Sequence, residues 1–113
     1  MKIKAERLSS QIAREVAKIL HEKARSEMLK SVTVTAAEVS NDYSVAKVWY
    51  TFLGDYDKKL VDEELKNAAG YLRSELANRI DVRHTPELRF TFDESIAYGS
   101  NIERILNQIN EEK

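Results

Sequence analysis

The chain has 113 residues, of which 42% are hydrophobic and 33% charged, which fits one domain with one core and excludes intrinsic disorder for its body. With no cysteine and no run near the roughly 20 apolar residues of a membrane span, the sequence excludes disulfides, cysteine-based zinc sites and membrane insertion, and favours the cytosol. The 18 basic and 19 acidic residues give a net charge of −1, so nucleic-acid binding requires that the basic residues be segregated.

The first predicted element is an amphipathic helix over residues 5–24. Its apolar residues recur at the spacing of one helical face. They are Leu8, Ile12, Val16, Ile19 and Leu20. At about 100° per residue, five basic residues fall in a sector of roughly 80° nearly opposite that face. They are Lys4, Arg7, Arg14, Lys18 and Arg25. We therefore expect the helix to carry a basic ridge.

A β-hairpin is predicted next. Residues 31–39 and 45–53 are rich in β-branched and aromatic side chains, and the polar run at 40–44 separates them. Alternation in the second strand divides its residues between the two faces of the sheet. One face has Ala46, Val48, Tyr50 and Phe52, and the other has Lys47, Trp49 and Thr51. The first of these faces is expected to pack against a core.

Helical periodicity returns over residues 60–80 and is interrupted by one glycine, Gly70. A glycine inside a helix costs about 1 kcal/mol relative to alanine. We therefore interpret the segment as two short helices that meet at Ala68-Ala69-Gly70, either at a kink or in close contact.

The last predicted elements are a third strand and a C-terminal helix. The strand starts at or after Pro86, where Leu88, Phe90 and Phe92 alternate with polar residues. The helix covers residues 102–109, with the last few residues of the chain frayed. The resulting order is helix, strand, strand, two helices joined by a kink, strand and helix. This order predicts one α+β domain over residues 1–113, with a three-stranded sheet covered on one face by helices.

A second group of basic residues is spread over the second helix of the pair and the segment into the third strand. It consists of Arg73, Arg79, Arg83, His84 and Arg89. Both basic groups suit contacts with phosphates. The alternatives are an ordinary solvated face for the ridge, diluted by Glu15 and Glu22, and surface ion pairs with Glu75 or Glu87 for the second group. Trp49 is either a stacking platform for a base or, more often for such a residue, covered by neighbouring side chains.

No pattern in the sequence indicates catalysis or a bound cofactor. His21 and His84 have no partner at the spacing of metal ligands, and Asp93-Glu94 fits a turn or a helix start better than a catalytic pair. A P-loop, a dinucleotide fingerprint and a nucleophile elbow are all missing. We expect no catalytic residue, no metal, no cofactor and no small-molecule substrate.

Four stretches stand out in order along nearly the whole chain. They are the basic first helix, VTVTAAEVSNDYSVAKVWYTFLG at 32–54, AAGYLRSELANRI at 68–80 and RHTPELRFTFDESIAYG at 83–99. Together they resemble the ribosome-binding factor A family, bacterial assembly factors of the small ribosomal subunit. The resemblance implies a type II KH-like fold in which an Ala-x-Gly kink, here Ala68-Ala69-Gly70, replaces the GxxG loop. The turn at Ser26-Glu27-Met28-Leu29 departs from the acidic-proline-arginine turn common in that family.

The resemblance also implies a function. It implies a cytoplasmic protein that binds the immature 30S subunit near the decoding-site helix and the 5′ region of 16S rRNA. It further implies a role in late rRNA processing and growth in the cold, and release when assembly is complete. We expect a monomer with Ala68, Ala69 and Gly70 shaping the helical surface. The residues expected to contact phosphates are Lys4, Arg7, Arg14, Lys18, Arg73, Arg79, Arg83 and Arg89.

Two other functions stay open at this point. A general KH module would bind short, unstructured single-stranded RNA, whereas an assembly factor would prefer the folded subunit. A protein-interaction adaptor would use the open face of the sheet or the acidic tail, and its complexes would survive nuclease treatment.

Overall fold

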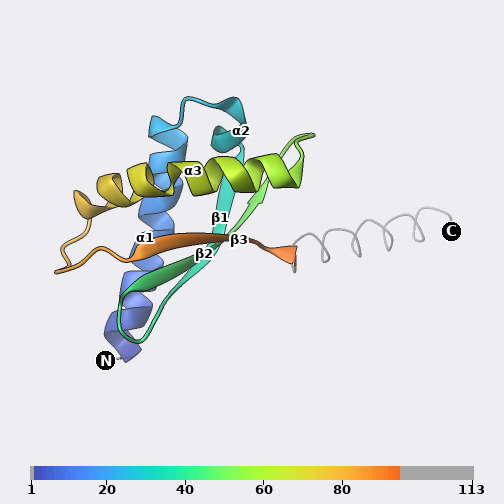
Figure 1. Cartoon of the computed structure of the whole chain (residues 1–113). Coiled ribbons are helices and arrows are strands. Elements are labelled where there is room, and N and C mark those ends of the chain that lie inside the picture. Colours follow the sequence, from blue (N-terminus) through green and yellow to red (C-terminus); the bar gives the residue numbers. More distant parts are fainter. Residues whose placement is uncertain (1, 95–113) are drawn as a thin grey trace, which may run out of the picture.

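The computed structural model describes residues 2–94, with side chains from residue 5 onward. This part of the chain forms three helices and three strands, whose arrangement Figure 1 shows. In chain order they are α1 (Lys2–Lys23), α2 (Glu27–Lys30), β1 (Val32–Val39), β2 (Val45–Phe52), α3 (Lys58–Ala77) and β3 (Glu87–Phe92). The α+β class and the three-stranded sheet are confirmed.

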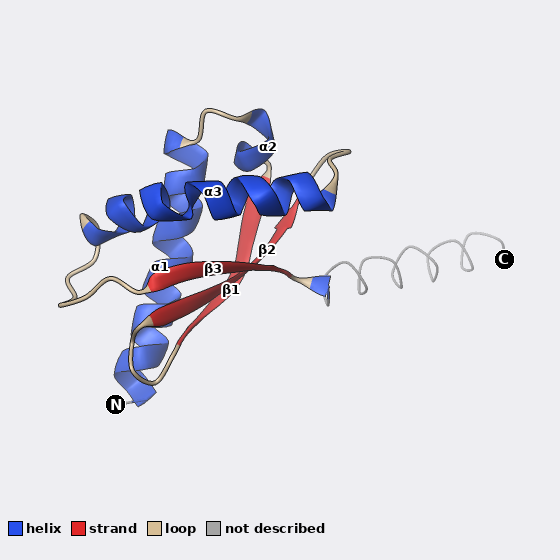
Figure 2. Cartoon of the chain, in the orientation of Figure 1, coloured by secondary structure: helices blue, strands red, loops and turns tan. Residues whose placement is uncertain are grey.

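The strands follow one another across the sheet in the order β1-β2-β3. β1 and β2 pair antiparallel as the predicted hairpin, whereas β2 and β3 pair parallel. A parallel pair needs a crossover between its strands, and α3 provides it (Figure 2). Because the register joins Val45 to Glu87, the segment before β3 lies at the same end of the sheet as the hairpin turn.

The core lies between one face of the sheet and the two long helices. The predicted alternation in β2 is confirmed, since Ala46, Val48 and Tyr50 are fully buried and Lys47 is exposed. From the helices the fully buried residues include Ile12, Val16, Ile19, Val61, Leu65 and Leu76. All three strands bury the same face, and no helix within residues 2–94 covers the opposite face, which is called the open face below.

Tyr50 is the largest fully buried side chain of the core. Its ring meets Phe90 and Phe92 edge-on, with centroids 6.4 and 5.7 Å away. Its hydroxyl donates a hydrogen bond of 3.3 Å to Oδ1 of Asp62 on α3. Burial, together with the negative charge of Asp62, raises the pKa of Tyr50 to about 12.

Helix α1 is joined to strand β1 at the outer edge of the sheet. The Ser9 hydroxyl donates to the carbonyl of Ala5 at 2.8 Å and accepts from the backbone N–H of Val39 at 3.0 Å. The β1–β2 register shifts between Val34 and Ala36, which marks a bulge in β1. The N-terminal half of α1 is therefore held beside the end of β1 that leads into the hairpin turn.

The prediction of two separate helices meeting at Ala68-Ala69-Gly70 is wrong, because α3 is a single helix. Gly70 is exposed, and a Cβ added there would meet no heavy atom within 4 Å. Leu65 and Leu72 are buried on either side of it. Burying one such side chain stabilises by roughly 1.5–3 kcal/mol, more than the approximately 1 kcal/mol that a helical glycine costs. Packing against the core therefore continues the helix through the glycine.

The other predicted elements have different outcomes. The first helix, the hairpin and the strand after Pro86 are confirmed, with ends that differ by a few residues. Helix α2 was not predicted, and its first turn is capped by Ser26, whose hydroxyl accepts from the N–H of Leu29 at 3.2 Å. The predicted C-terminal helix lies outside the described residues.

Candidate nucleic-acid interface

An open groove of about 710 Å³ lies where α1, the hairpin turn and the segment before β3 meet. The parallel β2–β3 pairing and the contact between Ser9 and Val39 bring these three regions to one end of the sheet. The groove is lined by Arg7, Leu8, Gln11, Asp42, Tyr43, Ser44, Arg73, Val82, Arg83, His84 and Thr85. Three arginines and one aspartate give this lining a formal charge of +2, whereas the whole chain carries −1.

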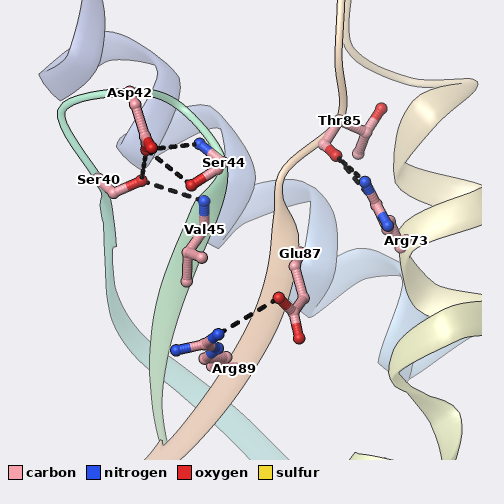
Figure 3. Close-up of polar contacts among 8 residues, drawn as sticks. All are labelled: Ser40, Asp42, Ser44, Val45, Arg73, Thr85, Glu87 and Arg89. Carbon is pink, nitrogen blue, oxygen red and sulfur yellow. Dashed lines mark hydrogen bonds and ion pairs between the residues drawn. The ribbon is translucent and has the colours of Figure 1, made fainter.

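Arg73 fixes one wall of the groove. From α3 its Nε and Nη2 donate hydrogen bonds of 2.9 and 2.8 Å to the carbonyl oxygen of Thr85 (Figure 3). These bonds tie the segment before β3 to the helix. Since a carbonyl carries no net charge, Arg73 keeps its full positive charge toward the groove.

The hairpin turn forms the opposite wall and is held by Asp42 (Figure 3). Oδ1 of Asp42 accepts hydrogen bonds from the Ser44 hydroxyl at 2.7 Å, the Ser40 hydroxyl at 2.8 Å and the Ser44 N–H at 3.1 Å. These bonds lower the pKa of Asp42 to about 2. The turn places Tyr43 at a φ of 62°, a backbone conformation that residues other than glycine, asparagine and aspartate seldom adopt.

The structure brings three of the predicted phosphate contacts together in this groove, namely Arg7, Arg73 and Arg83. All three are exposed, and within residues 5–94 none of them forms an ion pair with a carboxylate. They come from α1, α3 and the segment before β3. No carboxylate of the described residues therefore compensates their charge, which suits them to bind an anion.

Three other predicted contacts have acidic partners. Arg79 lies 3.7 Å from Glu15 and 3.3 Å from Glu22, so it links the turn after α3 to α1, and its side chain is only 24% exposed. Lys18 is 3.7 Å from Glu15. On the open face of the sheet, Arg89 is 3.4 Å from Glu87, as the ion-pair alternative anticipated. The charge of these three residues is at least partly compensated.

Two predicted contacts remain, Arg14 and Lys4. Arg14 is exposed and borders a shallow depression between α1 and residues 34–37 of β1. The side chain of Lys4 lies outside the described part of the chain. Along α1 the residues of the predicted ridge therefore have different surroundings, since Arg7 borders the groove, Arg14 borders another depression two turns further along the helix, and Lys18 is in an ion pair.

A family model for ribosome-binding factor A matches residues 4–106. The chain belongs to the ribosome-binding factor A family. It is 39% identical to ribosome-binding factor A of Macrococcus caseolyticus over 114 residues, with full coverage of both chains. It is 43% identical to that of Nitrosomonas europaea over 103 residues, which cover 90% of this chain and 88% of the relative. The resemblance noted in the sequence is confirmed.

Two structures of ribosome-binding factor A from Thermus thermophilus, one crystallographic and one a fitted model, are similar in fold. The crystal structure superposes with a TM-score of 0.70 at 26% identity, covering 77% of this chain and 93% of the other. The second is a homology model fitted into a cryo-EM map of a 30S complex. It superposes with a TM-score of 0.67 at 26% identity, covering 80% of this chain and 96% of the other.

In this member of the ribosome-binding factor A family, the open face of the sheet is a separate surface from the groove and has different side chains. Trp49 is half-buried there, and Nζ of Lys47 lies 4.9 Å from the centre of its ring. Across that face Trp49 pairs with Thr91, and Thr35 donates a hydrogen bond of 2.6 Å to Asp93. Trp49 is the single aromatic residue of the three strands on this face, and a sheet that stacks several bases needs more.

In the described part of the chain, neither a cluster of metal ligands nor a membrane-spanning helix is found. Within residues 5–94 no group of three histidine, aspartate or glutamate side chains is placed to hold a metal ion. None of the helices described is long and apolar enough to span a lipid bilayer.

Proposed function

We propose that the protein is an assembly factor that binds the immature 30S subunit through its 16S rRNA. Family membership supports this proposal, as does the similar Thermus thermophilus protein fitted in a 30S complex. The observation that carries it is the groove in which Arg7, Arg73 and Arg83 lie together without acidic partners in the described part of the chain. The protein acts as a cytosolic monomer and catalyses no reaction.

The three groove arginines make the principal phosphate contacts. A guanidinium has five N–H donors in a planar fork that matches phosphate oxygens. Arg73 uses two of them on Thr85 and keeps the others for RNA. Such contacts release condensed counterions, so binding weakens steeply as salt is raised.

The remaining predicted residues make secondary contacts. Exposed ion pairs are worth about 0–1 kcal/mol, so Lys18 and Arg89 exchange their carboxylates for phosphates at little cost. Arg79 is only 24% exposed between Glu15 and Glu22, so its exchange costs more. Arg14 and Lys4 add contacts along α1. The half-buried Ala68 and Ala69 and the exposed Gly70 give α3 a surface of small residues on which RNA approaches closely.

The biological role and the fold type that we propose for this protein are those implied by its family. The protein supports late maturation of the small subunit and processing of the 16S rRNA 5′ end, including in the cold. The domain extends over residues 1–113 and is of the type II KH-like kind. A bend of the continuous α3 at Ala68-Ala69-Gly70 takes the place of the GxxG loop.

Co-sedimentation with purified 30S subunits on a low-salt sucrose gradient tests the proposal. The wild-type chain should migrate with free 30S subunits and return to the top of the gradient as salt is raised. The double variant Arg7→Glu with Arg83→Glu should lose this co-migration and keep its far-UV circular dichroism. The matched control is Lys30→Glu with Lys59→Glu, which changes the net charge equally at exposed residues outside the groove and should still co-migrate.

The outcomes separate the proposal from its rivals. Equal loss in both double variants would show that total charge matters and that the groove does not. Tighter binding to short unstructured oligonucleotides than to 30S subunits would favour the single-stranded RNA module. A complex in cell lysate that survives nuclease treatment would favour the protein adaptor.

A further inference from the structure

The groove has a feature that phosphate contacts alone do not use. Besides its arginines, the groove is lined by the apolar side chains of Leu8 and Val82 and by the aromatic ring of Tyr43. Phosphate oxygens need donors and positive charge, and they gain nothing from an apolar lining. A nucleobase has two flat, largely apolar faces and stacks on aromatic side chains and on guanidinium planes.

Tyr43 is held in place for such stacking. It is half-buried, it lines the groove, and its backbone N–H donates to the carbonyl of Ser40 at 2.9 Å. The bonds from Ser40 and Ser44 to Asp42 fix the turn on both sides of it. A tyrosine on a turn that is already ordered loses little conformational entropy when a ligand binds.

Charge in the groove is arranged in a way that orients a nucleotide. Arg73 and Arg83 lie on the wall formed by α3 and the segment before β3, and Arg7 comes from α1. Asp42 lies on the hairpin wall beside Tyr43. Its negative charge repels a phosphate from that wall, whereas the arginines attract it to theirs.

We propose that the groove holds one unpaired nucleotide of a structured RNA, with the base stacked on Tyr43 and the phosphate at Arg7 and Arg83. This inference rests on the proposed function and adds to it the kind of RNA element that the groove takes. Bulges and internal loops supply such nucleotides, because an unpaired base costs less to remove from a helix than a paired one.

An RNA hairpin with a single bulged 2-aminopurine, compared with the fully paired hairpin of the same stem, tests this inference on the full chain. The wild type should bind the bulged hairpin roughly ten-fold more tightly, as expected for one stacked base. The fluorescence of 2-aminopurine should fall on binding. Tyr43→Asn removes the ring and suits a positive φ, so it should abolish the preference. Tyr43→Phe keeps the ring and should preserve it.

Three results would overturn the inference. They are equal binding of the bulged and paired hairpins by the wild type, an unchanged preference in Tyr43→Asn, and competition by adenosine monophosphate as strong as that by the bulged hairpin. Such competition by adenosine monophosphate would mean that the groove binds free nucleotides. If Tyr43→Asn fails to fold, the inference is tested by comparing how tightly the wild type and Tyr43→Phe bind the bulged and the paired hairpin.

Failure of this inference is distinguishable from failure of the proposed function. Co-migration of the wild type with 30S subunits, without any preference for the bulge, would leave the assembly factor standing and remove the nucleotide from the groove. A preference for the bulge without co-migration would keep the nucleotide in the groove and remove the 30S subunit as the partner.

Discussion

Replacing Gly70 by alanine is expected to stabilise the protein by about 1 kcal/mol. Gly70 lies in the interior of α3, and a Cβ there would meet no heavy atom within 4 Å apart from its chain neighbours and the backbone of its own helix, so the new methyl group causes no steric strain. The gain arises because alanine loses less backbone entropy than glycine on folding. For a domain of this size it corresponds to a rise of about 4 °C in melting temperature. Urea and thermal unfolding, followed by far-UV circular dichroism, measure both quantities.

The same substitution at Gly54 is the matched control and should have the opposite sign. Gly54 has a φ of +103°, and an added Cβ would lie 2.9 Å from Cε2 of Tyr56. Alanine there is strained and should lower stability by about 1 kcal/mol or more. If Gly70→Ala also fails to stabilise while Gly54→Ala behaves as expected, the backbone at Gly70 is not regular helix, and the account of α3 given above is refuted.

Two further predictions concern Arg73 and Tyr50. Arg73→Met removes both hydrogen bonds to the Thr85 carbonyl, so amide hydrogen exchange in residues 82–85 should speed up, whereas Arg83→Met should leave it unchanged. Equal exchange in the two variants would show that Arg73 does not hold this segment. The folded protein keeps the Tyr50 proton up to a pKa of about 12, but the unfolded chain releases it near 10.0, so alkali favours unfolding. Between these pH values the urea midpoint of the wild type should fall more steeply than that of Tyr50→Phe. Parallel curves would mean that Tyr50 is not the group responsible.

Elements defined by local periodicity were predictable from the sequence. The apolar stripe of α1, the alternation in β2 and the run after Pro86 each repeat over several residues. Helix α2 has only four residues, too few for a period, and its start depends on one capping hydroxyl from Ser26. The continuity of α3 was mispredicted because the cost of Gly70 is visible locally, whereas the burial of Leu65 and Leu72 depends on the rest of the fold.

The candidate site was only partly predictable. The sequence identified Arg7 and Arg83 as phosphate contacts, but their meeting in one groove depends on the parallel pairing of β3 with β2. The packing of α1 against α3 and the turn after it determines which basic residues have their charge compensated by a carboxylate. Arg79, which lies between Glu15 and Glu22, is an example. Tyr43 was missed because its polar neighbours indicated only a turn, and a positive φ is not a preference of tyrosine.

The junction between α1 and β1 has a consequence for contacts between copies of the protein. β1 is an outer strand, and an unpaired strand edge is a template on which another chain adds its own strand. Here the Ser9 hydroxyl already occupies the outward N–H of Val39, and the bulge between Val34 and Ala36 breaks the regular spacing of the edge. A second chain would therefore meet an interrupted ladder at this edge. The same helix that brings Arg7 to the groove thus helps to protect the β1 edge of the sheet against edge-to-edge pairing.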